Sequence, residues 1–93
     1  MQPDKIYKVK IVISGFTKAQ VETDLKDLLN EIGRRPWLFD AQAFWDDSIN
    51  KLVVIVGYEF EIRLEDGAFD EISDCVMATM QFDEKIEFDI QRL

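Results

Sequence analysis

The change of hydrophobic period at Gly15 constrains the fold of this 93-residue chain more than any other feature. In residues 5–13 apolar side chains occupy alternate positions, and this period of two predicts a half-buried strand. The residues expected to face the core are Tyr7, Val9, Ile11 and Ile13. Beyond Gly15 the apolar residues recur with the helical period of about 3.6, which predicts a helix. A strand followed by a helix is therefore the first unit of the fold.

The helix that follows has recognisable ends in the sequence. Thr17 is a favoured N-cap residue, and Gln20 three residues later completes a capping box. Gly33 is expected to end the helix as its C′ residue, and Pro36 prevents continuation. The apolar face predicted for this helix consists of Val21, Leu25, Leu28, Leu29 and Ile32.

Four further elements follow along the chain. Residues 39–45 predict a second strand, and the polar residues 46–50 predict a short turn into a third strand over residues 52–61. Residues 65–80 predict a second helix, and residues 85–90 predict a last strand. The third strand is expected to direct Tyr58 and Phe60 toward the core. The second helix is expected to direct Phe69, Ile72, Val76 and Met80 inward, with Ala68 and Cys75 beside them. The last strand is expected to contribute Ile86, Phe88 and Ile90.

The order β-α-β-β-α-β is that of a ferredoxin-like α+β sandwich, in which two helices cover one face of a four-stranded antiparallel sheet. We expect a single domain over residues 1–93, with residues 1–4 loose at its start. In this fold the first and last strands are antiparallel neighbours. Their outward side chains are expected to form opposite-charge pairs, with Lys8 and Lys10 against Glu87 and Asp89.

Composition and charge predict where the protein is located and which classes of partner it does not bind. No segment approaches the ~20 apolar residues that span a bilayer, and the lone Cys75 fits a reducing compartment, so we expect a soluble cytoplasmic protein without a membrane partner. The net charge is −8, and residues 37–93 hold fourteen acidic side chains against four basic ones. Such a field repels a phosphate backbone and attracts basic partners, so direct nucleic-acid binding is disfavoured.

The sequence offers no set of residues for a known catalytic centre. It has no histidine, which removes the commonest general base and most zinc sites, and its four glycines are scattered, which excludes a glycine-rich phosphate loop. Asp46, Asp47 and Asn50 lack the spacing of a calcium loop, and turn formation explains them. We therefore expect no enzymatic activity, no catalytic residues, no metal and no cofactor.

One candidate interface combines aromatic and β-branched residues of the sheet. Phe44 and Trp45 must point to opposite faces of a strand, so one of them lies on the helix-free face. An exposed apolar patch there would mark an interface with a protein partner or with a second copy of the chain in a homodimer. The alternative is that the aromatic residues near Pro36 only cover one end of the core. The candidate interface residues are Phe44, Trp45, Trp37, Val12, Val53 and Ile55.

Two charged groups supply the other candidate sites. Asp66, Asp70 and Asp74 recur every four residues beside Glu71, and this acidic stripe could dock a basic protein or could be an ordinary solvated face. Arg34 and Arg35 could bind an anion, or could interact with the C-terminal end of the first helix.

Three functions are consistent with these features. The favoured one is a small interaction module that self-associates or docks a partner through the open sheet face. The second is an acidic inhibitor or immunity-type protein that occupies a basic site on a nucleic-acid-binding enzyme. The third is a sensor of small anionic ligands at Arg34 and Arg35.

Overall fold

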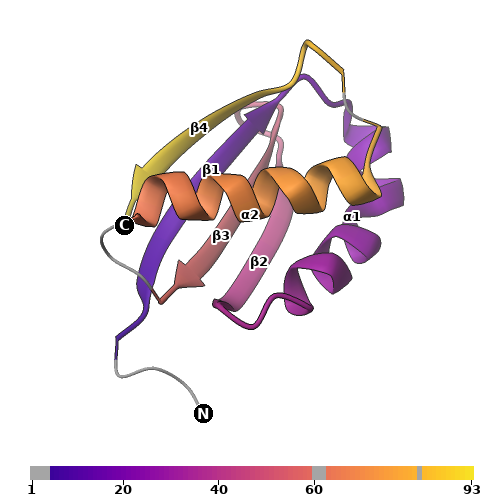
Figure 1. Cartoon of the computed structure of the whole chain (residues 1–93). Coiled ribbons are helices and arrows are strands. Elements are labelled where there is room, and N and C mark those ends of the chain that lie inside the picture. Colours follow the sequence, from indigo (N-terminus) through magenta and orange to yellow (C-terminus); the bar gives the residue numbers. More distant parts are fainter. Residues whose placement is uncertain (1–4, 60–62, 82) are drawn as a thin grey trace.

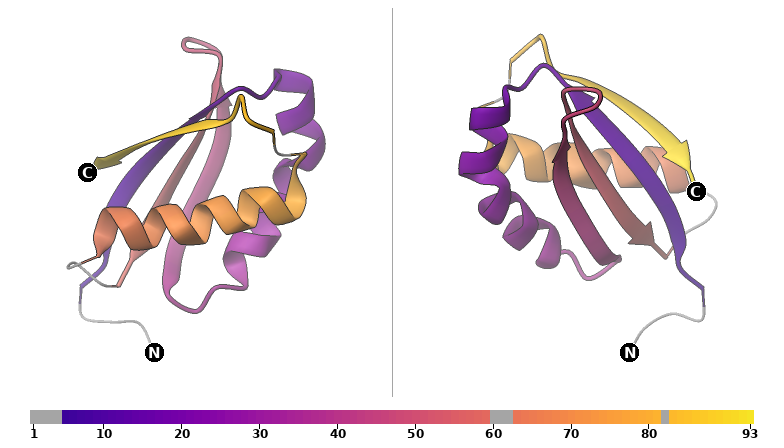
Figure 2. Two further views of the ribbon diagram at one scale, coloured as in Figure 1. Left: turned by 45° about the horizontal axis from the view of Figure 1, so that its top comes forward. Right: turned by 180° about the vertical axis from the view of Figure 1, so that it is seen from behind.

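The computed structural model describes residues 5–59, 63–81 and 83–93, and it confirms the ferredoxin-like α+β fold. The sheet is antiparallel with strand order β2-β3-β1-β4, and both helices lie on one of its faces (Figures 1 and 2). Residues 1–4, expected to be loose, lie outside the described residues. The elements are β1 (Tyr7–Ser14), α1 (Lys18–Gly33), β2 (Leu38–Asp46), β3 (Lys51–Tyr58), α2 (Leu64–Thr79) and β4 (Glu87–Arg92).

The core lies between the helices and the two central strands. α1 packs mainly against β2, and α2 packs against α1, β1 and β4. The alternation that predicted β1 is confirmed, because Val9, Ile11 and Ile13 are completely buried under the helices and Tyr7 is partly buried against the same core. The sheet contributes six completely buried side chains to this core: Val9, Ile11, Ile13, Leu52, Val54 and Val56.

The capping box of α1 is confirmed in both directions. The Gln20 N–H donates to the Thr17 hydroxyl oxygen at 3.1 Å, and the Thr17 N–H donates to the Gln20 side-chain oxygen at 2.8 Å. The predicted end of the helix is wrong by two residues: Gly33, expected as the C′ residue, is still helical, and Arg34 is the C-cap with a φ of −79°. Because N–H groups just beyond the helix bond back to carbonyls three residues earlier, no left-handed glycine is needed there.

α2 is rotated relative to the prediction. Phe69, expected in the core, is 37% exposed, whereas Ala68 and Cys75, expected at the flanks, are completely buried. The cause is the close approach of Gly67 to the β3 residue Tyr58: a Cβ on Gly67 would lie 2.5 Å from the Tyr58 hydroxyl oxygen. The ring of Tyr58 thus occupies space that a side chain at position 67 would need, and this contact sets which face of the helix turns inward.

The register of β4 corrects the predicted charge pairs. β4 extends to Arg92, two residues beyond the predicted end of the last strand. As a result Lys10 lies opposite Gln91, and Asp89 lies opposite Val12 rather than opposite a lysine. The predicted pairing of Lys8 and Lys10 with Glu87 and Asp89 is therefore wrong, although the antiparallel β1–β4 neighbourhood itself is confirmed.

Both remaining strands depart slightly from the predicted ranges. β3 ends at Tyr58, which is 8% exposed in the core as predicted, while Phe60 lies outside the described residues. β2 contains a bulge between Phe39 and Gln42, and Asp40 within it has a φ of 52°. In the part of the chain that the structure describes, neither helix has the length and apolar character to cross a membrane.

Candidate functional site

Of the two aromatic residues Phe44 and Trp45, Phe44 lies on the helix-free face of the sheet. The sequence predicted that either Phe44 or Trp45 would lie there, without deciding between them. Strand pairing aligns Phe44, Val53, Val12 and Asp89 in one row across β2, β3, β1 and β4. Phe44 is 39% exposed. Its neighbours Ala43 and Trp45 pack against the core, so Phe44 points to the opposite face of β2, and in the rear view of Figure 2 this face of the sheet lies in front of α2. The adjacent row on the same face consists of Gln42, Ile55, Lys10 and Gln91.

Trp45 lies on the other face of β2. It is opposite Leu52, a fully buried core residue, and both Trp45 and Trp37 pack against the core cluster. The Trp45 indole N–H is buried and has no hydrogen-bond partner among the described residues. The structure therefore separates the six candidate interface residues: the two tryptophans belong to the helix side, and the other four share the helix-free face.

The apolar surface on the helix-free face is small and is centred on Phe44. Val53 is fully buried and Val12 is 9% exposed even though no helix covers them, and both lie on the two central strands of the sheet. Ile55 is only half-buried, and Ile49 in the β2–β3 turn is 43% exposed. A partner that docked here would contact Phe44 first, with Ile55 beside it.

Charges of both signs surround this patch. Asp46 lies opposite Lys51 at the end of β2, and Lys10 lies in the row next to Phe44. Two hydrogen bonds from Ser48, through its hydroxyl at 2.6 Å and its N–H at 2.9 Å, lower the pKa of Asp46. Ser48 and Asp46 thus form the hydrogen-bonded turn predicted for residues 46–50. The patch has an apolar centre and a polar rim, as protein interfaces commonly do.

Arg34 and Arg35 already have carboxylate partners. Arg35 lies 3.3 Å from Glu71 and 3.6 Å from Glu31, so it joins α2 to the end of α1, and Arg34 lies 3.3 Å from Glu31. The adjoining hollow, about 270 Å³, is lined by Asp27 and Glu31 as well as by Arg34. An anion would have to compete with these carboxylates, and an anion-binding role for the two arginines stays a prediction.

Cys75 is buried beside this ion-pair cluster. Burial raises the pKa of the Cys75 thiol above its ordinary value of 9.0, and the neighbouring Arg35 guanidinium offsets part of that rise. A thiol that is buried and protonated is a poor nucleophile. Cys75 therefore acts here as a small core residue.

The raised pKa of Cys75 predicts how stability depends on alkaline pH. The folded protein binds the thiol proton more tightly than the unfolded chain does. The contribution of the protonated Cys75 thiol to the free energy of unfolding is therefore complete below about pH 9, and it is lost as the pH rises through the folded-state pKa. Urea unfolding between pH 7 and pH 10.5 should show a steeper alkaline loss of stability for the wild type than for Cys75→Ala. Equal pH dependence of the two proteins would contradict this prediction.

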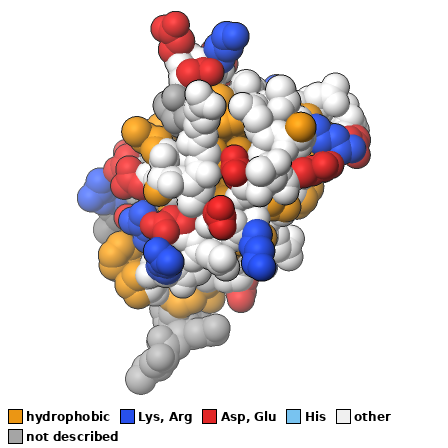
Figure 3. All heavy atoms as spheres, turned by 90° about the vertical axis from the view of Figure 1, so that its right-hand side faces the viewer, with side chains coloured by type: hydrophobic (Ala, Val, Ile, Leu, Met, Phe, Trp, Pro, Cys, Tyr) orange, Lys and Arg blue, Asp and Glu red, His pale blue; other side chains and the backbone are white. Residues whose placement is uncertain are grey.

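The acidic stripe on α2 is exposed, but one of its four members is engaged. Asp66, Asp70 and Asp74 are exposed, and no lysine or arginine among the described residues forms an ion pair with them. Glu71 instead lies partly buried against Arg35. Seen from the side on which α1 lies (Figure 3), acidic and basic side chains are interspersed rather than gathered into one acidic surface.

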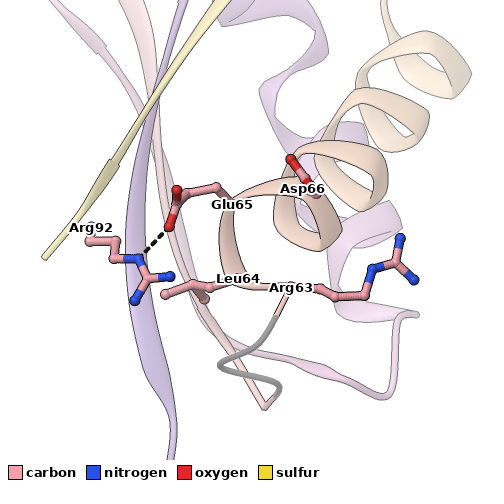
Figure 4. Close-up of a pocket in the computed structure, with 5 residues that line it drawn as sticks. All are labelled: Arg63, Leu64, Glu65, Asp66 and Arg92. Atoms are coloured by element: carbon pink, nitrogen blue, oxygen red, sulfur yellow. Dashed lines mark hydrogen bonds and ion pairs between the residues drawn. The ribbon is translucent and has the colours of Figure 1, made fainter.

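The hollow at the start of α2 is small and polar. Figure 4 shows Glu65 pointing toward Arg92 of β4, with which it forms an ion pair, while Arg63 and Asp66 point away. Its volume is about 80 Å³, well below the several hundred Å³ of typical ligand pockets. Among the residues that the structure describes, no three Cys, Asp or Glu side chains are grouped so as to hold a metal ion.

Comparison with known proteins supports the fold and gives no function. No protein-family model and no curated protein matches the sequence. A crystal structure of a conserved protein from Methanosarcina mazei Go1 is similar over 94% of this chain and 92% of its own, with a TM-score of 0.50 and 14% sequence identity. At that identity the likeness concerns the fold alone.

Proposed function

We propose that this protein is a non-enzymatic interaction module that binds a protein partner through the helix-free face of its sheet. The observation that carries the proposal is Phe44, an aromatic side chain 39% exposed on a face without helices. Aromatic residues at the centre of a patch dominate the binding energy of many protein interfaces. Ile55 adds apolar area beside Phe44 in the neighbouring row.

The charge around Phe44 favours a protein over a nucleic acid as the partner. Lys10 and Lys51 on this face are balanced by Asp46 and Asp89, and the whole chain carries a net charge of −8. Nucleic-acid sites require a positive field. A cytoplasmic location belongs to the same proposal, since the one cysteine has no disulfide partner within the chain.

The proposal predicts that Phe44→Ala weakens capture of the partner by about tenfold or more, because a central aromatic contact is lost. Tagged wild type and variants would be exposed to native lysate, and the retained proteins would be quantified by mass spectrometry. Phe69→Ala is the matched control, since Phe69 is also a phenylalanine and is 37% exposed, but on α2. Equal capture by wild type and Phe44→Ala would overturn the proposal.

A second experiment locates the partner on the surface. A photo-crosslinking residue would replace Gln42, which lies on the helix-free face, or Asp70, which lies on the acidic stripe. The proposal predicts crosslinks to the partner from position 42 only. Binding through the apolar patch should also persist at high salt, because salt screens charges and does not weaken apolar contacts.

The acidic stripe supports a second candidate function, that of an acidic inhibitor of a basic protein. The observation in its favour is that Asp66, Asp70 and Asp74 lie exposed along α2, without an ion-pair partner among the described residues. Under this alternative, crosslinks would form from position 70, and capture would weaken steeply with salt. The two functions therefore predict opposite results in the same pair of experiments.

A further inference from the structure

The two edge strands of the sheet differ in how well they can pair with another strand. The bulge at Asp40 interrupts β2, and bulges on edge strands obstruct further pairing. β4 pairs with β1 from Glu87 to Arg92 without any shift in register. None of the residues of β4 is a proline or has a positive φ. β4 therefore presents the regular edge of the sheet.

The backbone groups of β4 alternate in direction. The Leu93 N–H donates to the Lys8 carbonyl oxygen of β1 at 3.0 Å. In an antiparallel pair every second residue directs both of its backbone groups toward the same neighbouring strand. Gln91 and Asp89 therefore also face β1, and Ile90 between them directs its N–H and C=O toward the outer edge.

We propose that a second copy of this chain pairs antiparallel with the outer edge of β4, with the two-fold axis at Ile90. Ile90 of each copy then donates to and accepts from Ile90 of the other, and two four-stranded sheets become one sheet of eight strands. Phe88 of one copy then lies opposite Arg92 of the other in the strand register. The contacts of Phe88 with Phe69 and of Arg92 with Glu65 stay within each copy.

Charge selects this register over its neighbours. With the axis at Ile90, Asp89 lies opposite Gln91, whose side-chain amide already donates to Asp89 at 3.4 Å within one chain. With the axis at Asp89, two aspartates would lie directly opposite each other, which destabilises strand pairing. With the axis at Gln91, fewer residues of the two β4 strands would lie opposite each other. The register centred on Ile90 therefore avoids like-charge pairs over the longest overlap.

Net charge predicts how salt acts on this dimer. Each copy carries a charge of −8, so the two copies repel each other, and added salt should strengthen their association. The strand pair is short, so we expect a weak dimer that forms between about 10 µM and 1 mM. This response to salt is the reverse of that expected for docking of a basic protein on the acidic stripe.

Two substitutions at Gln91 test the register. Gln91→Lys would face Asp89 of the second copy and should tighten dimerisation by about three- to tenfold, whereas Gln91→Asp should weaken it by a similar factor. Within one chain Gln91 lies opposite Lys10, so the same substitutions should change monomer stability in the opposite direction. Sedimentation velocity measures dimerisation and urea unfolding measures stability. Movement of both quantities in the same direction would overturn the proposal.

Ile90→Pro tests the edge itself. Proline at position 90 removes an N–H that faces outward, so the ladder with β1 keeps its hydrogen bonds while dimerisation is lost. Circular dichroism would establish that the variant folds, and if it does not, the Gln91 pair decides. A wild type that stays monomeric at 1 mM, or a folded Ile90→Pro that still dimerises, would overturn the proposal. The proposed partner binding is tested separately, because Phe44→Ala leaves this edge unchanged.

Discussion

Gly15→Ala should lower the free energy of unfolding by about 2–4 kcal/mol. The new methyl group would strain the backbone at Gly15 and would also collide with a backbone atom of another segment. Gly15 has a φ of 105°, a conformation that side chains with a Cβ rarely adopt. An added Cβ would also lie 2.6 Å from the Lys85 carbonyl oxygen and 2.9 Å from Cδ1 of Ile86. The oxygen belongs to the segment that leads into β4, so it cannot move without displacing that strand. Urea unfolding followed by circular dichroism measures the loss.

Gly33→Ala is the matched control for this prediction. Gly33 is helical, and a Cβ there would meet no atom within 4 Å. Alanine has a higher helix propensity than glycine, so we expect a gain in stability of up to about 1 kcal/mol. The same chemical change should therefore have opposite signs at the two positions. A destabilisation of equal size at both would show that loss of glycine itself, rather than the geometry at Gly15, is responsible.

Trp45→Ala should destabilise the protein by about 2–4 kcal/mol, whereas Phe44→Ala at the adjacent position should cost about 1 kcal/mol or less. Trp45 packs against the core opposite Leu52, and its removal leaves a cavity under the helices. Phe44 is 39% exposed on the other face, so its truncation empties little buried volume. Equal costs for the two variants would contradict the strand register, because a shift by one residue would exchange the two faces.

Trp45→Phe separates packing from the indole group. The Trp45 N–H is buried without a hydrogen-bond partner among the described residues, so its removal carries no loss of a bond. Phenylalanine keeps most of the apolar contact, and we expect stability within about 1 kcal/mol of the wild type. A loss as large as that of Trp45→Ala would show that the indole nitrogen has a role that the fold does not reveal.

Local patterns predicted the elements of this fold well. The alternation in residues 5–13 and the capping box of Thr17 and Gln20 depend on neighbours in the sequence, and the structure confirms both. The order of strands and helices followed from these local signals, and it sufficed to predict the sheet and its two helices. Element ends were less accurate, since β4 extends to Arg92 because it finds hydrogen bonds along β1.

The candidate sites were less predictable, because they depend on pairs of residues far apart in the sequence. Arg35 was a candidate for anion binding, and nothing local indicated that Glu71 of α2 would lie 3.3 Å away. The same contact removes Glu71 from the acidic stripe. The sequence assigned Ile90 to the core face of the last strand and Asp89 to its outward face, but it did not indicate a binding site at the edge of that strand. Its significance depends on the bulge at Asp40 in β2, the other edge strand, and no local pattern in the sequence indicated that bulge.

Composition and local periodicity were enough to predict the types and order of the elements, and they fix the absence of histidine and the acidic net charge. The outward direction of Phe44 and the inward direction of Trp45 depend on strand pairing in the folded chain, because a strand pattern with aromatic residues on both faces is compatible with either register. The fold therefore distinguishes these two arrangements. It also decided that Phe69 is exposed, because the inward face of α2 depends on how closely Gly67 approaches Tyr58. For both the strand β2 and the helix α2, local sequence allows two orientations, and contacts with segments distant in sequence select one of them.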